Sequence, residues 1–325
     1  MILFTADWHI KLGQKNVPVK WAKERYLKFF DDLWEIEQVR NIHLHIVGGD
    51  IFDRVPTLEE LELYFEWVST VSVPTYIFDG NHEATKKNKT FFDQIAEVTY
   101  NLNNKVKVIT TSTVFEDGTN AHSTNAFGIL PYCELHKDDW HTFFPDDIPI
   151  FTHVRGEILP HVKPEVDLDL FNRFPVVFAG DLHAHSNCQR NIVYPGSPLT
   201  TSFHRNEVKT GYILINSANW MWEWHSFELP QLLKKTVSDP SEMIPTDYHH
   251  TVYEIEGNMK DLASVKDSDL LSKKIVKRST EVSLILDEKD SIQTHLQEYL
   301  THILKLDEKQ ITEIVSLFNG HARNT

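Results

Sequence analysis

Five short apolar runs occur in the first two-thirds of the chain, and a polar motif directly follows each of them. Runs of this length that are rich in β-branched and aromatic residues predict strands buried in a sheet. Helical periodicity covers residues 19–39 and 58–68, and Thr57 with Glu60 forms a capping box that opens the second helix. The alternation of strand and helix predicts an α/β fold. The five runs are residues 2–4, 44–47, 76–78, 148–151 and 176–179.

The helix predicted at residues 58–68 is apolar on more than one face. One interpretation is that the helix is buried inside the subunit. The other is that part of it forms a contact between subunits. Its apolar residues are Leu58, Leu61, Leu63, Tyr64, Phe65, Trp67 and Val68.

The pattern changes after about residue 229. Strand-like stretches appear at residues 250–255 and 282–286, and two helical patterns follow at residues 292–304 and 311–318. A chain of 325 residues is long for a single compact core. We therefore expect a main domain at residues 1–230, a small α+β cap domain at 231–287, and terminal helices at 288–325.

The composition is that of a soluble globular protein, and no apolar stretch approaches the roughly 20 residues that span a bilayer. The chain begins directly with a strand pattern, so we expect no signal peptide. Its two cysteines, Cys133 and Cys188, are too few for a disulfide framework. We expect two unpaired thiols and a cytoplasmic location.

The formal net charge of −15 argues against tight DNA binding by the chain alone. The balance reverses locally, because residues 11–30 contain six basic side chains against one acidic one, and a second basic cluster follows the motif at residues 80–83. These clusters are either solvated surface or contacts to a phosphate backbone. The candidates for DNA contact are Lys11, Lys15, Lys86, Lys87 and Lys89.

The polar motifs after the strands carry metal-binding residue types. Ligands at the carboxyl ends of adjacent strands converge in an open α/β sheet, and carboxylate, amide and imidazole groups suit a divalent ion such as Mn²⁺. Asp50 is the natural bridge between two ions, and His82 is placed to protonate a leaving oxygen. A single motif is weak evidence, whereas the ordered set predicts a two-metal phosphoesterase site. The motifs are Asp7-Trp8-His9, Gly49-Asp50-Ile51-Phe52-Asp53-Arg54, Gly80-Asn81-His82-Glu83, Thr152-His153 and Gly180-Asp181-Leu182-His183.

This set resembles the calcineurin-like metallophosphoesterase superfamily, and within it the SbcD nucleases and their relatives in the MRN repair complex, including phage recombination nucleases. The resemblance covers about residues 1–205 and includes Pro56, Pro131-Tyr132 and the turn Tyr194-Pro195-Gly196-Ser197-Pro198. It implies a four-layer α/β/β/α sandwich with a small C-terminal cap. It also implies two Mn²⁺ ions, for which Mg²⁺ could substitute, a homodimer built through the helix at 58–68, and an SbcC-like ATPase partner.

Carried onto this chain, the family pattern implies two overlapping ligand sets and a catalytic histidine, His82. The family has a histidine where this chain has Asp181, so either Asp181 ligates the second ion or a register shift recruits His185 instead. Asp53 and Arg54 would support the site without ligating. One ion would take Asp7, His9, Asp50 and His183, and the other would take Asp50, Asn81, His153 and Asp181.

The expected activity is a Mn²⁺-dependent DNA nuclease that acts as an exonuclease on duplex ends and as an endonuclease on single strands. A phosphomonoesterase or a small-nucleotide phosphodiesterase is the first alternative. A scaffold without catalysis is the second, and intact Asp50 and His82 argue against it. The terminal helices either pack on their own domain or dock on the ATPase, as amphipathic helices dock in apolar grooves.

Overall fold

The computed structural model describes residues 1–86, 89–117, 125–276, 291–304 and 306–322. It divides into two compact units, one formed by residues 1–255 with 267–273 and the other by 256–266 with 274–325. The boundary expected near residue 230 falls inside the first unit, and the division into three domains stays a prediction. The strand expected at residues 282–286 lies outside the described residues.

A six-stranded sheet in the order β13-β12-β1-β2-β3-β6 carries the first three motifs. Strands β1, β2, β3 and β6 run parallel, with Ile2 opposite Leu44 and His45 opposite Thr75, while β12 is antiparallel to β1 and to β13. Parallel strands end at the same edge, so the segments after β1, β2 and β3 lie together. The strands are β1 (Ile2–Thr5), β2 (Leu44–Gly48), β3 (Thr75–Phe78), β6 (Val106–Ile109), β12 (Thr210–Ile215) and β13 (Trp222–Phe227).

A five-stranded sheet in the order β11-β10-β9-β8-β7 carries the last two motifs. Strands β8 to β11 are parallel and β7 is antiparallel to β8. The predicted runs at 148–151 and 176–179 correspond to β9 and β10, which begin one or two residues later, so that His153 is the last residue of β9. The strands are β7 (Thr113–Asp117), β8 (Asn125–Leu130), β9 (Ile150–His153), β10 (Val177–Gly180) and β11 (Ile192–Val193).

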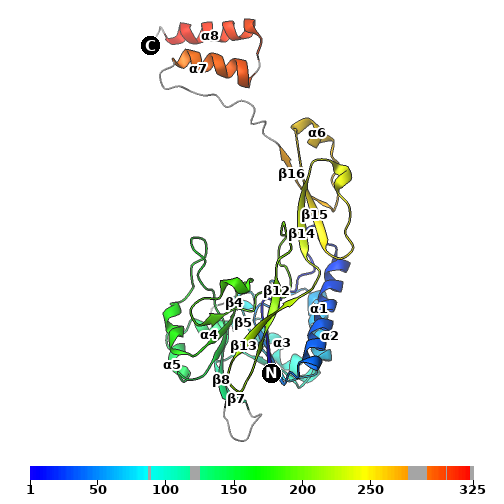
Figure 1. Ribbon diagram of the computed structural model, residues 1–325, viewed down its shortest axis with the longest axis vertical. Coiled ribbons are helices and arrows are strands. Elements are labelled where there is room, and N and C mark those ends of the chain that lie inside the picture. The colour runs from blue at the N-terminus through cyan, green and yellow to red at the C-terminus, as the bar shows by residue number, and fades with distance from the viewer. Residues whose placement is uncertain (87–88, 118–124, 277–290, 305, 323–325) are drawn as a thin grey trace. The chain divides into compact units, whose positions relative to one another are not determined.

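The two sheets pack face to face with helices on their outer faces, and the predicted mixed α/β architecture is confirmed. Alternation along β1 turns Ile2 and Phe4 toward the second sheet, where Phe4 meets Phe151 with ring centroids 5.3 Å apart, and turns Leu3 toward the helices. Figure 1 shows α1 and α2 on one outer side and α5 on the other. The helices are α1 (Val19–Val39), α2 (Leu58–Thr70), α3 (Phe92–Leu102), α4 (Tyr132–Leu135) and α5 (Trp140–Phe143), with 3₁₀ turns at Leu168–Arg173, His185–Asn187 and Pro240–Glu242.

Helix α2 begins as the sequence predicts. The Glu60 backbone amide donates to the Thr57 hydroxyl, and the Glu60 carboxylate accepts from the Thr57 amide. Of the apolar residues on α2, four are buried in the core, Leu61 and Phe65 are half-buried against it, and Leu58 is 80% exposed. Burial inside the subunit therefore accounts for most of the apolar residues that lie outside a single face of this helix.

Three further groups of elements complete the described chain. The hairpin β4 (Ala84–Lys86) and β5 (Lys89–Thr90) follows the third motif, and β14, β15 and β16 form a three-stranded sheet. In the second unit, α7 and the π-helical turn after it pack with α8 around Leu300, Ile311 and Val315. The remaining elements are β14 (Leu232–Val237), β15 (His250–Gly257), α6 (Met259–Ser264), β16 (Leu271–Val276), α7 (Ile292–Glu298), the π turn Tyr299–Ile303 and α8 (Glu308–Ala322).

Candidate metal centre

The first two motifs are joined by backbone hydrogen bonds beyond the ends of their strands. The amide of Asp7 donates to the carbonyl of Gly49 at 3.0 Å, and the amide of His9 donates to the carbonyl of Asp50 at 2.9 Å. In the second sheet, Gly180 lies opposite His153 in the register of β9 and β10. The folded strands therefore fix the backbones that carry the predicted ligands.

Four of the predicted ligands have a left-handed backbone conformation. The φ angles are 58° at Asp7, 46° at His9, 52° at Asp50 and 99° at Asp181. A positive φ is uncommon for residues other than glycine, and such strain persists only where the surrounding structure enforces it. Its concentration at these motifs is an independent sign of a functional site.

Two glycines allow the ligand loops to approach each other closely. Gly49 has a φ of 84°, and a Cβ there would lie 2.7 Å from Nδ1 of His153. A Cβ at Gly80 would collide with Oδ1 of Asp50. Packing therefore requires glycine at both positions, and the backbone conformation requires it at Gly49 as well.

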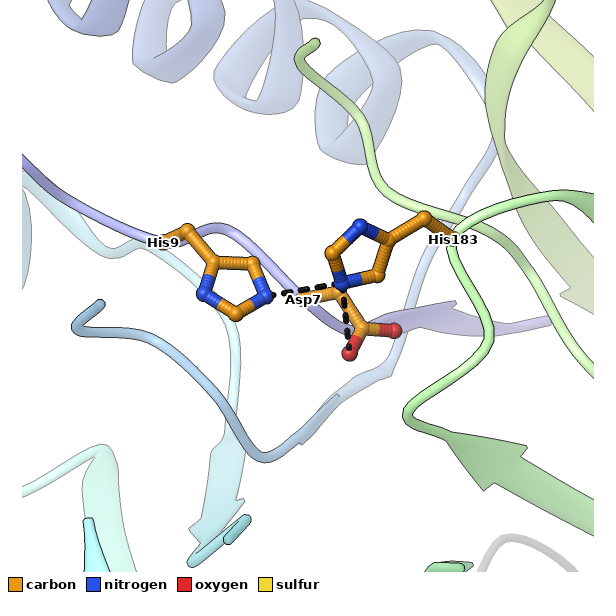
Figure 2. A group of neighbouring side chains, drawn as sticks. All are labelled: Asp7, His9 and His183. Carbon is orange, nitrogen blue, oxygen red and sulfur yellow. Dashed lines mark hydrogen bonds and ion pairs between the residues drawn. The ribbon is translucent and has the colours of Figure 1, made fainter. Parts of the chain in front are cut away.

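A first group of ligand atoms comes from Asp7, His9 and His183 (Figure 2). The Nε2 atoms of the two imidazoles face each other at 2.9 Å, and Nε2 of His183 lies 4.0 Å from Oδ1 of Asp7. Nδ1 of His183 lies 3.2 Å from the hydroxyl of Thr201, which orients the ring from behind. These three donors lie close enough together to share one ion.

A second group comes from Asp7, Asp50 and His153. Nδ1 of His153 donates to the carbonyl of Gly48 at 2.8 Å, so Nε2 faces Oδ2 of Asp50 at 3.5 Å and Oδ1 of Asn81 at 3.0 Å. Asp50 also lies 3.6 Å from Nε2 of His9, so its carboxylate faces ligands of both groups. This is the position that a bridging carboxylate requires.

The electrostatics of the cluster reflect burial and close mutual contact. Burial raises the pKa of Asp7 well above its usual value and lowers the pKa of His9 to about 3. Burial alone would raise the pKa of Asp50 and lower that of His153, but the attraction between these two residues reverses both shifts. The two groups therefore stabilise each other's charged forms.

The donor set fits hard or borderline divalent ions. It consists of carboxylate, amide and imidazole donors without a thiolate, a set of oxygen and nitrogen ligands that Mn²⁺ accepts. Asp7 and Asp50 are both buried, and within the described part of the chain their ion-pair partners are histidines alone. A bound cation would compensate these buried negative charges.

His82 lies at the edge of the cluster with its side chain 35% exposed. Its Nδ1 donates to the carbonyl of Asp53 at 2.5 Å, and its Nε2 lies 3.8 Å from Oδ2 of Asp50. His82 also forms a third possible metal group with His9 and Asp50. The geometry accommodates either contact with a substrate oxygen or ligation, and metal titration of His82 variants separates the two.

Asp181 and His185 have different surroundings. The amide of Asp181 donates to Oδ1 of Asp7 at 3.0 Å, and Oδ1 of Asp181 lies 4.0 Å from Nε2 of His153. His185 instead donates from Nδ1 to the carbonyl of Tyr194 at 2.7 Å and stacks on Trp224 at 5.1 Å. The three metal groups found among the described residues include neither Asp181 nor His185.

Asp53 and Arg54 lie beside the cluster. Asp53 Oδ1 is 3.8 Å from Nδ1 of His9, and its Oδ2 forms an ion pair of 2.6 Å with Lys11. Arg54 pairs with Glu60 at 3.2 Å. The contact of Asp53 orients the ring of His9, and the pair of Arg54 with Glu60 anchors the loop to α2.

The lysines predicted to contact DNA are distributed around these loops. Lys11 is engaged with Asp53, whereas Lys15 and Lys89 are exposed. Lys87 and the side chain of Lys86 lie outside the described part of the structure. Contact of these lysines with DNA stays a prediction.

Glu83 has a structural role that the sequence interpretation did not assign. Its buried carboxylate accepts three backbone hydrogen bonds of 2.9 Å, from Asp50, Phe52 and Gly80. Burial and then the charge of Asp50 raise its pKa to about 8, although the amide donors oppose this shift. Its place in the motif Gly80–Glu83 was the available signal, and only the fold shows that it joins two ligand loops.

Comparison with known proteins agrees with this geometry. Residues 1–185 match the family model described as calcineurin-like phosphoesterase, and the chain belongs to that family. The predicted resemblance is confirmed.

Two relatives show how far the similarity extends along the chain. The chain is 43% identical over 324 residues to a protein of Escherichia phage T5 named "Probable exonuclease subunit 1", covering 97% of this chain and 96% of that one. It is 23% identical over 250 residues to a Staphylococcus saprophyticus protein, the SbcD component of the nuclease SbcCD, covering 67% of this chain and 66% of that one. Among the described residues, no helix is long and apolar enough to cross a bilayer.

Proposed function

We propose that this chain is the nuclease subunit of an SbcD-like enzyme that hydrolyses phosphodiester bonds in DNA with two divalent ions. The observation that carries the proposal is the convergence of the predicted ligands from five strand ends, with Asp50 facing both groups and His82 beside it. The names of its two relatives, both components of nucleases, support DNA as the substrate.

The proposed ligand sets are those that the family resemblance implies, and the groups around Asp7, His9 and His183 and around Asp50 and His153 support them. One ion would be held by Asp7, His9, Asp50 and His183, and the other by Asp50, Asn81, His153 and Asp181. We propose Mn²⁺ as the preferred ion because imidazole nitrogens are numerous among these donors, whereas Mg²⁺ sites favour oxygen ligands and retained waters. A bound pair of such ions supplies Lewis-acid chemistry at the phosphate.

The side chains around the site perform the remaining tasks. Asp50 keeps the two ligand groups in one geometry, and the glycines beside it let them approach. Nδ1–H of His82 is held by the carbonyl of Asp53, so Nε2 faces the site and, when the ring carries its second proton, would give that proton to the departing oxygen. Thr201 and Asp53 hold the rings of His183 and His9 from outside the cluster.

The proposed substrates are duplex ends, cut by an exonuclease activity, and single strands, cut by an endonuclease activity. The test is cleavage of end-labelled duplex and of circular single-stranded DNA with Mn²⁺ or Mg²⁺, alongside p-nitrophenyl phosphate and cyclic nucleotides. Cleavage of DNA with little turnover of the small esters supports the proposal. The reverse preference would establish the alternative, a phosphomonoesterase or small-nucleotide phosphodiesterase.

We also propose an SbcC-like ATPase partner and a homodimer. Helices α7 and α8 pack around a small core of their own and still expose apolar side chains, including Ile292 at 73% and Leu317 at 63%. The dimer would use the side of α2 that carries Leu58. We expect both assemblies in the cytoplasm of the host cell, where the substrate is found.

A further inference from the structure

Arg155 lies beside the candidate metal centre, two residues after the predicted ligand His153. Its guanidinium donates through Nε and Nη2 to the two carboxylate oxygens of Asp181, at 3.4 and 3.3 Å. The planar shape of a guanidinium matches a carboxylate or a phosphate through two parallel hydrogen bonds. A histidine at position 181, as the family pattern has it, could not accept such a pair.

The backbone of Arg155 is also fixed. Its amide donates to Oε1 of Glu165 at 3.0 Å, and Oε2 of Glu165 accepts from the hydroxyl of Tyr132 at 2.9 Å. The negative charge of Asp181 raises the pKa of Arg155. Burial acts in the opposite direction but does not cancel this effect. The side chain is therefore a fixed positive charge at the edge of the centre.

The arginine retains capacity for another partner. Its side chain is 40% exposed, and within the described residues Nη1 has no hydrogen-bond acceptor. The guanidinium thus contacts one predicted ligand, Asp181, whose Oδ1 lies 4.0 Å from Nε2 of another, His153. An anion that contacts the metal centre would come within reach of this group.

Charge balance gives a second argument. Replacing a neutral histidine by Asp181 adds one negative charge where a phosphodiester must approach, and Arg155 offsets that charge. The guanidinium of Arg155 offsets this charge beside the metal centre, and its 40% exposed side chain is accessible to a phosphate.

We propose that Arg155 binds a non-bridging oxygen of a DNA phosphate next to the metal centre, with Asp181 and Glu165 holding its guanidinium in position. The proposal rests on the proposed nuclease function and adds a substrate-positioning residue to it. It predicts that Arg155 acts on DNA binding separately from metal binding.

The test compares Arg155→Gln and Arg155→Lys with wild type and with a matched control, Arg190→Gln. Arg190 is also 40% exposed and also paired with a carboxylate, that of Asp169. Binding of a fluorescent single-stranded oligonucleotide is measured by anisotropy with Ca²⁺ in place of Mn²⁺, at several salt concentrations. Metal binding without DNA is measured by calorimetry.

We expect Arg155→Gln to weaken oligonucleotide binding about tenfold and to reduce the slope of log K against log salt by about 0.7, the value for one phosphate contact on a single strand. Arg155→Lys should keep most of that slope, because it keeps the charge, but should lose part of the affinity, because lysine cannot form the paired hydrogen bonds with Asp181 that hold the group in position. Arg190→Gln should match wild type. In cleavage assays KM should rise more than kcat falls.

An unchanged salt slope and oligonucleotide affinity in Arg155→Gln would overturn the inference, and weaker metal binding in the same variant would identify Arg155 as a charge partner of Asp181 alone. If Arg155→Gln does not fold, the Arg155→Lys comparison decides: full oligonucleotide affinity in Arg155→Lys would overturn the inference, because lysine cannot make the paired contact with Asp181 that holds the guanidinium in position. Wild-type protein that neither binds nor cleaves DNA would instead refute the nuclease proposal itself.

Discussion

The backbone amide of His82 donates a hydrogen bond of 2.9 Å to Oδ1 of Asp50. The residue proposed to bridge two ions and the residue proposed to act on the leaving oxygen are therefore fixed to each other. A change at Asp50 removes a metal ligand and also disturbs the loop that places His82. A change in the His82 side chain leaves this backbone bond in place.

The first prediction follows from this difference between changes at Asp50 and changes in the His82 side chain. Asp50→Asn should lose metal affinity and nuclease activity together, because a neutral amide replaces the shared carboxylate. His82→Ser should keep metal binding and lose about 10²–10⁴-fold in kcat, the range for a general acid or base. Calorimetric metal titration and single-turnover cleavage measure the two effects.

His82→Asn serves as a second variant of similar size. If both His82 variants lose an ion in the titration, His82 is a ligand, as its place beside His9 and Asp50 permits. Full activity in either variant would refute the proposed role in proton transfer.

The second prediction concerns the departure from the family pattern. Asp181→Ala should weaken metal binding more than His185→Ala, because the His185 ring is committed to the carbonyl of Tyr194 and to Trp224. Asp181→His should stay folded and partly active, since imidazole nitrogen also suits Mn²⁺. The opposite order of the two alanine variants in a metal titration would favour the register shift that makes His183 and His185 the ligand pair of this motif.

The third prediction concerns the buried carboxylate of Glu83, which joins two ligand loops. Glu83→Gln replaces one accepting oxygen by an NH₂ group that faces backbone donors, and should lower the free energy of unfolding by about 1–3 kcal/mol. Urea unfolding of the metal-free protein measures this change. Glu97→Gln, at an exposed position on α3, is the control and should be neutral.

A Glu83→Gln variant as stable as the control would mean that water satisfies the three amides. In that case the carboxylate does not hold the loops together. Metal affinity measured on the same variant then shows whether the loops still bring Asp50 and Asn81 together.

The fourth prediction concerns the proposed homodimer. Leu58 is 80% exposed, whereas Leu61 and Phe65 also pack against the core, so Leu58→Glu disturbs an interface with the least damage to the fold. A closed two-fold contact places the new charge of each subunit in the same patch. Light scattering at micromolar concentration should show a dimer for wild type and a monomer for Leu58→Glu.

Leu159→Glu is the matched control, because Leu159 is 76% exposed and lies outside α2. It should remain dimeric. A monomeric wild-type protein would refute the dimer outright.

The fifth prediction concerns the terminal helices. Truncation after residue 290 removes α7 and α8, and should leave Mn²⁺-dependent cleavage of short substrates intact while abolishing co-purification with the ATPase. Leu317→Glu in the full chain should weaken that association as well, because Leu317 is exposed on α8. Glu313→Gln on the same helix is the control. Full partner affinity in the truncated protein would place the docking surface elsewhere.

The sequence predicts the strand ends, the helix α1 and the capping box of α2 because these depend on local periodicity and local hydrogen bonds. It also predicts which motifs converge, since parallel strands end at one edge. It does not predict the pairing of Lys11 with Asp53 or of Arg155 with Asp181. These contacts depend on how loops from different strands turn, and no local pattern encodes that.

The position of β1 has a consequence for how the chain can be synthesised and folded. Strand β1 is central in its sheet, between β2 and the antiparallel β12 at residues 210–215. More than half of the chain must therefore be synthesised before the sheet that carries Asp7 and His9 is complete. A fragment ending at residue 185, where the family match ends, would lack β12 and leave one edge of the four-residue strand β1 unpaired. The segment that identifies the family is therefore shorter than the segment that completes this sheet.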